Sequence, residues 1–255
     1  MIKIFLNDDL LAKHLALQIL KQLKRKKKLV LGCPGGRSLK KTYFYIGRLS
    51  TKLNIGFNNL TIVMMDEYVD KKKGKYFLVN PKSHYSCVRF SKQVIKRLFN
   101  YKKNKKNELK KENILFPSID SPDAYDKKIN KIGGIDIFLL ASGSSDGHVA
   151  FNNYNSNITE KTHIIKLSNK TRLDNMKTFS KFKKLNEVPK YGLTVGLNTI
   201  SSLSKMGILV LTGKEKKYSY QRVKSLNKFD ESWPASIIYK CKSKKIYIDN
   251  VVQYK

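Results

Sequence analysis

Two segments of this chain contain acidic side chains that can take up or release protons. Asp146 and His148 lie two residues apart in segment 141–152, where a carboxylate can orient an imidazole and raise its pKa for proton transfer. Asp66 and Glu67 follow an apolar run, where burial raises a carboxyl pKa and makes one of them a candidate general base. A surface turn and a helix cap are the alternative interpretations of the two segments.

A third segment, Gly32–Ser38, has residues that suit an anion. Gly35 and Gly36 permit close approach of the backbone, and a helix beginning after this turn would offer free N–H groups. Arg37 and Ser38 can complete a phosphate site. The segment is neither a Walker A sequence nor GxGxxG, so nucleotide binding is not supported, and a tight turn without a ligand is the alternative.

Strands and helices that alternate along the chain must position these segments. Short apolar runs predict strands at 2–5, 29–33, 60–65, 135–140, 207–211 and 246–248. Helices are expected after a cap at Asp8 or Asp9, after Ser38, over 83–99, after 121–123 and after 212–214.

This alternation predicts an α/β fold of Rossmann-like type, a doubly wound, mostly parallel sheet with helices on both faces. The carboxyl ends of parallel strands meet at one edge of a sheet, where such folds bind their ligands. The three polar segments all follow strands of this kind. We therefore expect them to converge on one active site.

Composition bounds the class of protein. A chain of 255 residues with 41% hydrophobic content predicts one large domain over residues 1–255. The net charge of +33 would favour a nucleic acid, but only seven of the 52 basic residues are Arg and the Lys residues occur in every polar stretch. We therefore predict no specific nucleic-acid partner.

The cysteines and the apolar runs indicate the compartment. Cys33, Cys87 and Cys241 are widely spaced and form no CxxC pair, so neither a disulfide framework nor a metal site is predicted. The chain has no run of about 18 apolar residues and no basic segment before an apolar one at its N-terminus. These features predict a cytoplasmic protein without membrane contact.

Six segments together resemble the glucosamine-6-phosphate deaminase (isomerase) family, whose relatives include 6-phosphogluconolactonase. They have the order and spacing of that family over nearly the whole chain and are 32–38, 65–69, 80–86, 133–138, 146–152 and 188–196. Segments 65–69 and 80–86 are similar to the deaminase branch. A lactonase would be expected to have a Gly-Asp-Glu-Arg type of sequence near Asp66.

The resemblance implies an aldose–ketose isomerisation with loss of ammonia, which turns glucosamine 6-phosphate into fructose 6-phosphate without a cofactor or metal. Asp66 would move a proton between C2 and C1 of the open-chain sugar, with Glu67 beside the substrate. His148 would open the pyranose ring with help from Asp146. The implied partner is a small-molecule phosphosugar, and the protein would be a monomer or a homo-oligomer.

The resemblance also assigns a phosphate site and a lid. Gly36, Ser38, Arg172 and Lys216 match positions that bind the phosphate, and Arg172 would lie on a mobile lid of residues 159–187. Gly35 and Arg37 of the same turn stay phosphate-site candidates from their residue types, since the family usually has a small residue at the position of Arg37. An anchored dianionic phosphate can supply binding energy that orients the reacting carbons.

Asn153 is the main departure from the family, which has Glu at this position. An amide can hydrogen-bond the imidazole but cannot stabilise its cation, so ring opening is expected to be impaired or adapted. The basic residues of the allosteric site in hexameric bacterial members fall on His163 and Ile165, so activation by an N-acetylated sugar phosphate is not expected. Two alternatives stay open: an enzyme for another phosphosugar or a lactone, and a degenerate sugar-phosphate-binding protein.

Overall fold

The computed structural model describes residues 2–253, in which seven strands form one parallel sheet. The strand order is β1-β11-β10-β7-β2-β3-β6, and every pair of neighbours is parallel. The strands are β1 (Ile2–Phe5), β2 (Leu29–Cys33), β3 (Leu60–Met64), β6 (Ile114–Leu115), β7 (Ile137–Ala141), β10 (Met206–Leu211) and β11 (Ser243–Asp249). The predicted α/β class with a mostly parallel sheet is confirmed.

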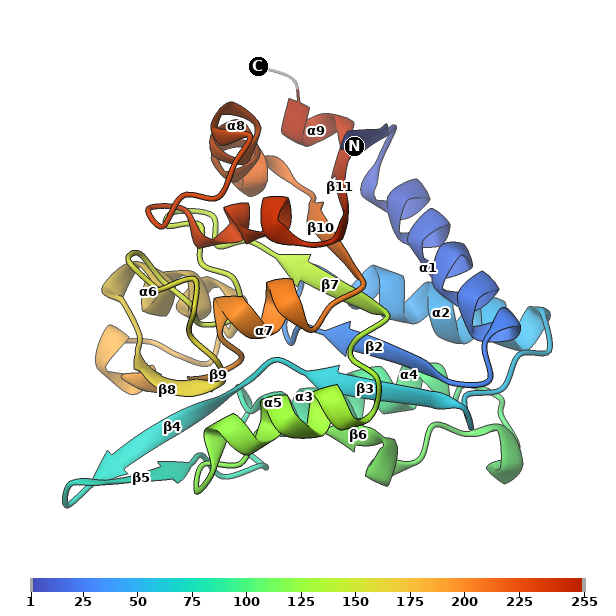
Figure 1. Cartoon of the computed structure of the whole chain (residues 1–255), viewed down its shortest axis with the longest axis horizontal. Coiled ribbons are helices and arrows are strands. Elements are labelled where there is room, and N and C mark those ends of the chain that lie inside the picture. Colours follow the sequence, from blue (N-terminus) through green and yellow to red (C-terminus); the bar gives the residue numbers. More distant parts are fainter. Residues whose placement is uncertain (1, 254–255) are drawn as a thin grey trace.

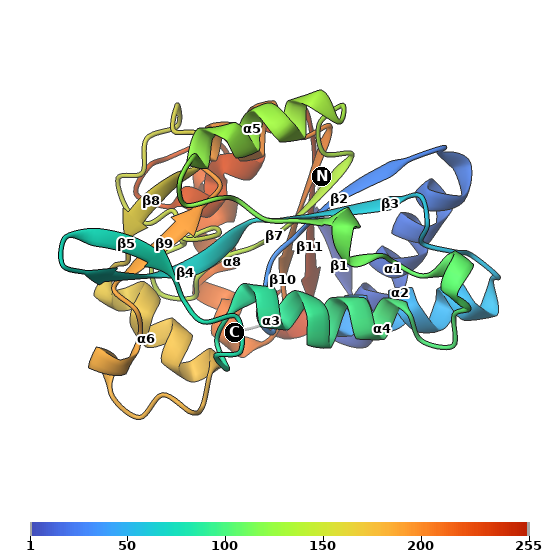
Figure 2. The same ribbon diagram turned by 90° about the horizontal axis from the view of Figure 1, so that it is seen from below.

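Helices cover both faces of this sheet (Figure 1, Figure 2). One layer contains α1 (Asp8–Arg25), α2 (Lys40–Lys52) and a continuous helical segment made of α3 (Cys87–Phe90), a π-helical turn (Ser91–Lys96) and α4 (Arg97–Phe99). The other contains α5 (Pro122–Lys131), α7 (Leu197–Ser202), α8 (Lys217–Leu226) and the 3-10 helix Pro234–Lys240, and α9 (Asn250–Gln253) ends the described chain. None of the helices in residues 2–253 is long and apolar enough to cross a bilayer.

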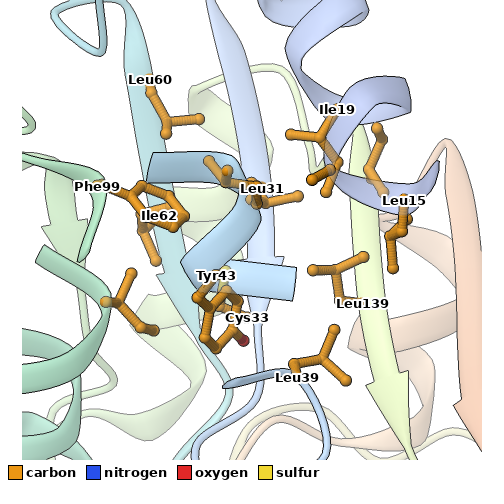
Figure 3. Close-up of a cluster of buried hydrophobic side chains, with 14 of the residues drawn as sticks. Leu15, Ile19, Leu31, Cys33, Leu39, Tyr43, Leu60, Ile62, Phe99 and Leu139 are labelled. Atoms are coloured by element: carbon orange, nitrogen blue, oxygen red, sulfur yellow. The ribbon is translucent and has the colours of Figure 1, made fainter. Parts of the chain in front are cut away.

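Alternating side chains of the buried strands divide the core between the two helical layers. Leu31 and Cys33 of β2 pack against α1 and α2, whereas Val30 packs on the opposite face, because successive side chains of a strand point to opposite sides. Figure 3 shows Ile19 of α1 and Tyr43 of α2 against this first face. Both faces are therefore apolar, and the strand ends that follow are held by a packed framework.

The cap of α1 is one residue earlier than predicted. Asn7 has extended backbone angles, and its side chain accepts a hydrogen bond from the Leu10 N–H at 2.9 Å. Asp8 and Asp9 already belong to the helix, where Asp8 forms an ion pair with Lys41 of α2 at 2.7 Å. The prediction of an aspartate cap was wrong because a capping residue must lie outside the helical conformation.

A second, antiparallel sheet of order β5-β4-β9-β8 was not predicted. Its strands are β4 (Asp66–Lys72), β5 (Lys75–Leu78), β8 (His163–Lys166) and β9 (Tyr191–Thr194). The chain passes from β3 into β4 across one residue, so this sheet extends from the carboxyl edge of the first (Figure 1). The expected lid, 159–187, contains β8 and the helix α6 (Asn169–Thr178), and its movement stays a prediction.

Candidate active site

The carboxyl ends of four neighbouring strands, β10, β7, β2 and β3, open into one cleft of about 960 Å³. The turn after β2, Asp66 after β3, His148 after β7 and Lys216 after β10 all line it. The structure therefore brings together one group from each strand end, which is where a parallel sheet of this topology binds its ligand.

The turn at residues 34–38 presents backbone to the cleft. Gly36 has φ +86°, in the left-handed region that favours glycine, and the Tyr43 hydroxyl donates to the Pro34 carbonyl at 2.8 Å. In the described structure no side chain caps the following helix α2. The Lys40 N–H donates to the Arg37 carbonyl at 3.1 Å, and the next N–H groups of the first turn are available to an anion. Arg37 and Ser38 lie beside these groups at the cleft surface.

Asp66 is the most deeply buried carboxylate of the cleft, at 6% exposure. Its pKa is raised from the ordinary 3.8 to about 6. Burial is the main cause and neighbouring Glu67 adds to it, whereas the Cys87 thiol and His148 oppose the rise. The thiol donates to Asp66 Oδ1 across 3.1 Å. A carboxylate with this pKa is mostly ionised at pH 7, yet it is a stronger base than an ordinary aspartate.

Glu67 does not reach the substrate cleft, contrary to the prediction. Its carboxylate accepts from the backbone N–H groups of Tyr68, Cys87 and Val88 and from the Ser86 hydroxyl, all within 3.0 Å. These bonds fill the carboxylate's hydrogen-bonding positions and anchor the beginning of α3. Glu67 is thus a structural residue that sets the position of Cys87.

Asp146 and His148 form the pair that their spacing predicts. Asp146 Oδ1 and His148 Nδ1 are 2.6 Å apart, and the sharp turn between them places both beside Gly143, where a Cβ atom would lie 2.2 Å from the imidazole. Burial by itself would raise the pKa of Asp146, but the His148 imidazole and the Thr171 hydroxyl hold it below its ordinary value. Because Nδ1 faces Asp146, Nε2 is the nitrogen left for a substrate.

Two hydroxyl groups of the expected lid hold Asp146 in turn. Thr171 Oγ1 donates to Asp146 Oδ2 at 2.7 Å, and Ser168 Oγ donates to the same oxygen at 3.2 Å. Ser168 also caps α6 by accepting from the Thr171 N–H. The sequence analysis missed both residues, although a serine before a helical segment is an ordinary capping signal.

Asn153 does not contact the imidazole. Its Nδ2 donates to the Lys166 carbonyl of β8 at 3.0 Å, and it is absent from the residues that line the cleft. The amide can hydrogen-bond an imidazole, but here it bonds to β8 instead, and its place among the catalytic residues stays a prediction. This hydrogen bond joins Asn153 to β8 of the second sheet.

Lys216 lies at the cleft as expected. Its Nζ donates to the Ser142 carbonyl at 2.6 Å and to Ser144 Oγ at 3.0 Å. Burial lowers the pKa of Lys216, and the charges of Asp174 and Glu215 oppose this shift. A partly desolvated ammonium attracts an incoming dianion strongly, because little water screens the interaction.

Arg172 is the clearest disagreement with the predicted phosphate site. Its guanidinium donates to the backbone carbonyls of Leu185 and Val188 and to the Asn169 side chain, and it is absent from the lining of the cleft. Helix α6 turns Asp174 and three other residues towards the cleft and leaves Arg172 on another side. The buried Arg172 thus joins α6 to the turn at 185–188.

We expect Arg172→Gln to lower the free energy of unfolding by about 2–4 kcal/mol, because buried carbonyls lose a charged donor. Phosphosugar affinity should change by less than about threefold, since the side chain lies outside the cleft. Urea unfolding and calorimetric titration measure the two quantities. A large loss of phosphosugar affinity with an unchanged free energy of unfolding would show that Arg172 does bind the phosphate.

Helix α6 supplies four cleft residues that the sequence analysis missed. Lys177 offers a cation, Asp174 a carboxylate, and Asn175 a buried side-chain amide whose Nδ2 has no partner among the described residues. Thr178 of the same helix lies over the glycine turn, 3.8 Å from where a Cβ of Gly36 would be. A buried donor without a partner beside a cleft is a position that a ligand can satisfy.

Asp146, His148 and Asp174 are the described residues whose ligand atoms come close enough to hold a metal ion together, within 4.8 Å of one another. Asp146 Oδ1 and His148 Nδ1 are hydrogen-bonded to each other. Asp174 Oδ2 accepts hydrogen bonds from the Ser144 N–H and the Ser145 hydroxyl. Each group already serves a hydrogen bond, so the arrangement suits an oriented acid–base pair.

Comparisons with known proteins identify the relatives of this chain. The family described as glucosamine-6-phosphate isomerases/6-phosphogluconolactonase matches residues 8–248. A glucosamine-6-phosphate deaminase of Mycoplasma mycoides is 31% identical over 244 residues, which cover 95% of this chain and 92% of the relative. A monomeric glucosamine-6-phosphate deaminase has a similar structure, with a TM-score of 0.83, 24% identity and coverage of 99% and 98%. A 6-phosphogluconolactonase of Thermotoga maritima, at TM-score 0.68, 15% identity and coverage of 98% and 99%, shares the fold.

Proposed function

The chain belongs to the family of glucosamine-6-phosphate isomerases and 6-phosphogluconolactonases, and we propose that it converts glucosamine 6-phosphate and water to fructose 6-phosphate and ammonia. One observation carries the proposal. A buried carboxylate with a pKa of about 6, Asp66, lies in the same cleft as the oriented His148 and an anion-binding turn. An aldose–ketose isomerisation of a phosphosugar needs these three functions.

The phosphate would bind at one end of the cleft. The turn Gly35–Ser38 and the first turn of α2 offer backbone N–H groups and a partial positive charge, and Lys216 and Lys177 offer cations. Arg37 adds a third cation at the surface. This arrangement anchors the substrate away from the reacting carbons, so that its binding energy orients C1 and C2.

Ring opening would be the task of His148. Its Nε2 takes the proton of the C1 hydroxyl and passes it to the ring oxygen as the C1–O5 bond breaks, which gives the aldehyde. Asp146 holds Nδ1 and stabilises the cation when the imidazole is protonated.

Asp66 then moves the proton that defines the isomerisation. It takes the proton from C2 of the open-chain amino sugar and returns it to C1. The C1 carbonyl oxygen gains the proton that the amine loses, which leaves a hydroxyl at C1 and an imine at C2. Water adds to this imine, and the C2–N bond breaks to release ammonia and the ketose. Since the carboxylate is buried, its ionised form is poorly solvated and therefore a better base.

The cysteines support a reducing compartment for this enzyme, which we place in the cytoplasm. Cys33, Cys87 and Cys241 are all free and buried.

An assay of ammonia and ketose formation over a panel of amino-sugar phosphates tests the proposal, with 6-phosphogluconolactone as a second arm. Ammonia and fructose 6-phosphate in equal amounts from glucosamine 6-phosphate support it. Hydrolysis of the lactone alone would assign the chain to the other branch of the family. Tight binding of glucosamine 6-phosphate without turnover would make the protein a sugar-phosphate sensor.

Thr171→Val should lower turnover of cyclic glucosamine 6-phosphate about tenfold, because Asp146 loses a hydroxyl donor and holds His148 less well. Asn153→Ala is the matched control, and we expect its turnover within about twofold of wild type, since the amide bonds to β8 outside the cleft. Steady-state kinetics measure both. A large loss in Asn153→Ala with a normal Thr171→Val would give Asn153 the role of orienting the histidine.

A further inference from the structure

Cys87 occupies an unusual place in the cleft wall, between the base and the anion-binding turn. It is 6% exposed and is the first residue of α3. Its Sγ is 3.1 Å from Asp66 Oδ1 and 3.4 Å from where a Cβ of Gly35 would be. Glu67 holds it there by accepting from the Cys87 N–H at 3.0 Å. The backbone of Cys87 is therefore held at a position from which the thiol reaches Asp66.

The thiol is the donor of this hydrogen bond. Burial raises the pKa of Cys87 well above its ordinary value, and the negative charges of Asp66 and Glu67 raise it further. The side chain therefore stays protonated and directs its S–H at Oδ1. Within residues 2–253 this thiol is the one hydrogen-bond partner of the Asp66 carboxylate, so Oδ2 is left as the oxygen that can take a proton.

We propose that Cys87 is a positioning residue for the general base: its thiol fixes Asp66 Oδ1, supports the ionised carboxylate and leaves Oδ2 for the substrate proton. The proposal rests on the proposed function, in which Asp66 moves the proton between C2 and C1. Hydrogen bonds to an ionised group are stronger than those between neutral groups, so a buried carboxylate with one donor depends strongly on that donor.

Other groups around Asp66 define its electrostatic surroundings and would stay unchanged in a Cys87 variant. Glu67 disfavours the ionised carboxylate and His148 favours it. The charge of Asp66 raises the pKa of the hydroxyl groups of three buried tyrosines, which are Tyr43, Tyr68 and Tyr125. Against this background, the Cys87 bond is the largest influence that lowers the pKa of Asp66 after burial has raised it.

Cys87→Ala and Cys87→Ser form a matched pair, because the two side chains are nearly equal in size and only serine keeps a donor. We expect Cys87→Ala to raise the pKa of Asp66 by about one unit from its value near 6, and Cys87→Ser to leave it at or below the wild-type value. A rise of this size would reduce kcat at pH 6 about fivefold through the smaller ionised fraction, with KM for the phosphosugar nearly unchanged.

The ¹³C resonance of the Asp66 carboxyl, assigned by its absence in Asp66→Asn, should be titrated in wild type and both variants, and the pH profile of kcat should be recorded beside it. A higher pKa in Cys87→Ala than in Cys87→Ser supports the proposal. Equal values in the two variants overturn it. If Cys87→Ala does not fold, Cys87→Val also lacks a donor and takes its place. The carboxyl titration needs no turnover, so an enzyme inactive on glucosamine 6-phosphate would refute the proposed function and still leave the Cys87 bond open to test.

Discussion

Asp66→Asn is expected to reduce turnover of glucosamine 6-phosphate by about 10²–10⁴, the usual contribution of a positioned acid–base group. An amide cannot accept the C2 proton, yet it has the size of the carboxylate and leaves the phosphate anchors intact. Binding of the phosphosugar should therefore stay within about threefold of wild type. Stopped assays and calorimetric titration of the variant measure the two effects.

A control variant separates this role from a general loss of negative charge. Asp123→Asn removes an exposed acid of α5 whose one ion pair within residues 2–253 is with Lys127 at 3.6 Å, and its turnover should equal that of wild type. More than about a tenth of wild-type turnover in Asp66→Asn would exclude Asp66 as the base.

Asp66→Asn should also stabilise the folded protein, and the pH dependence of the free energy of unfolding gives the sign of the effect. The folded pKa of Asp66 is about 6 and the ordinary value is 3.8, so between these values the folded state holds more protons than the unfolded state. Wild-type stability therefore falls as pH rises through this window. Asparagine resembles the neutral acid, so the variant should gain stability on the order of 3 kcal/mol at pH 7 and little near pH 4. Urea unfolding from pH 4.5 to 8 measures the difference.

Lys216→Gln should weaken binding of glucosamine 6-phosphate by about 10²-fold, because a partly desolvated cation in the cleft is lost. Unphosphorylated glucosamine should bind nearly as well as before, since it lacks the group that Lys216 attracts. Calorimetric titration with both sugars gives the comparison.

Lys214→Gln is the matched control for this variant. It removes an exposed lysine of the same loop that does not line the cleft, and phosphosugar affinity should be unchanged. Equal losses for the phosphorylated and unphosphorylated sugar in Lys216→Gln would show that Lys216 supports the cleft structure and does not recognise phosphate.

The sequence by itself determined the parallel sheet and the strand ends that meet at the cleft. Buried strands such as β2 and β7 are short apolar runs. Such runs can be recognised in the sequence without knowledge of the tertiary structure. The polar residues that follow them, among them Asp66 and His148, converge because all parallel strands end at the same edge. The resemblance to a known family then indicated what chemistry these residues perform.

Only the tertiary structure decided which neighbouring side chains face the cleft. Asp66 and Glu67 are adjacent acids with the same local signal, yet one lines the cleft and the other anchors α3. Arg172 and Lys177 are cations of one weakly amphipathic helix, so its sequence does not show which side meets the cleft. The packing of α6 against the turns at 34–38 and 185–188 settles that orientation.

The second sheet and the contact between Cys87 and Asp66 also could not be predicted from the sequence. β4 begins with two acids and ends with two lysines, so it lacks an apolar run, and it pairs with β9 more than a hundred residues away. Cys87 meets Asp66 only because Glu67 fixes the beginning of α3 beside β4. The local pattern of apolar residues indicates whether a segment is a helix or a strand. The contacts of Cys87 and β4 depend on long-range packing, in which segments with similar local patterns lie in different parts of the fold.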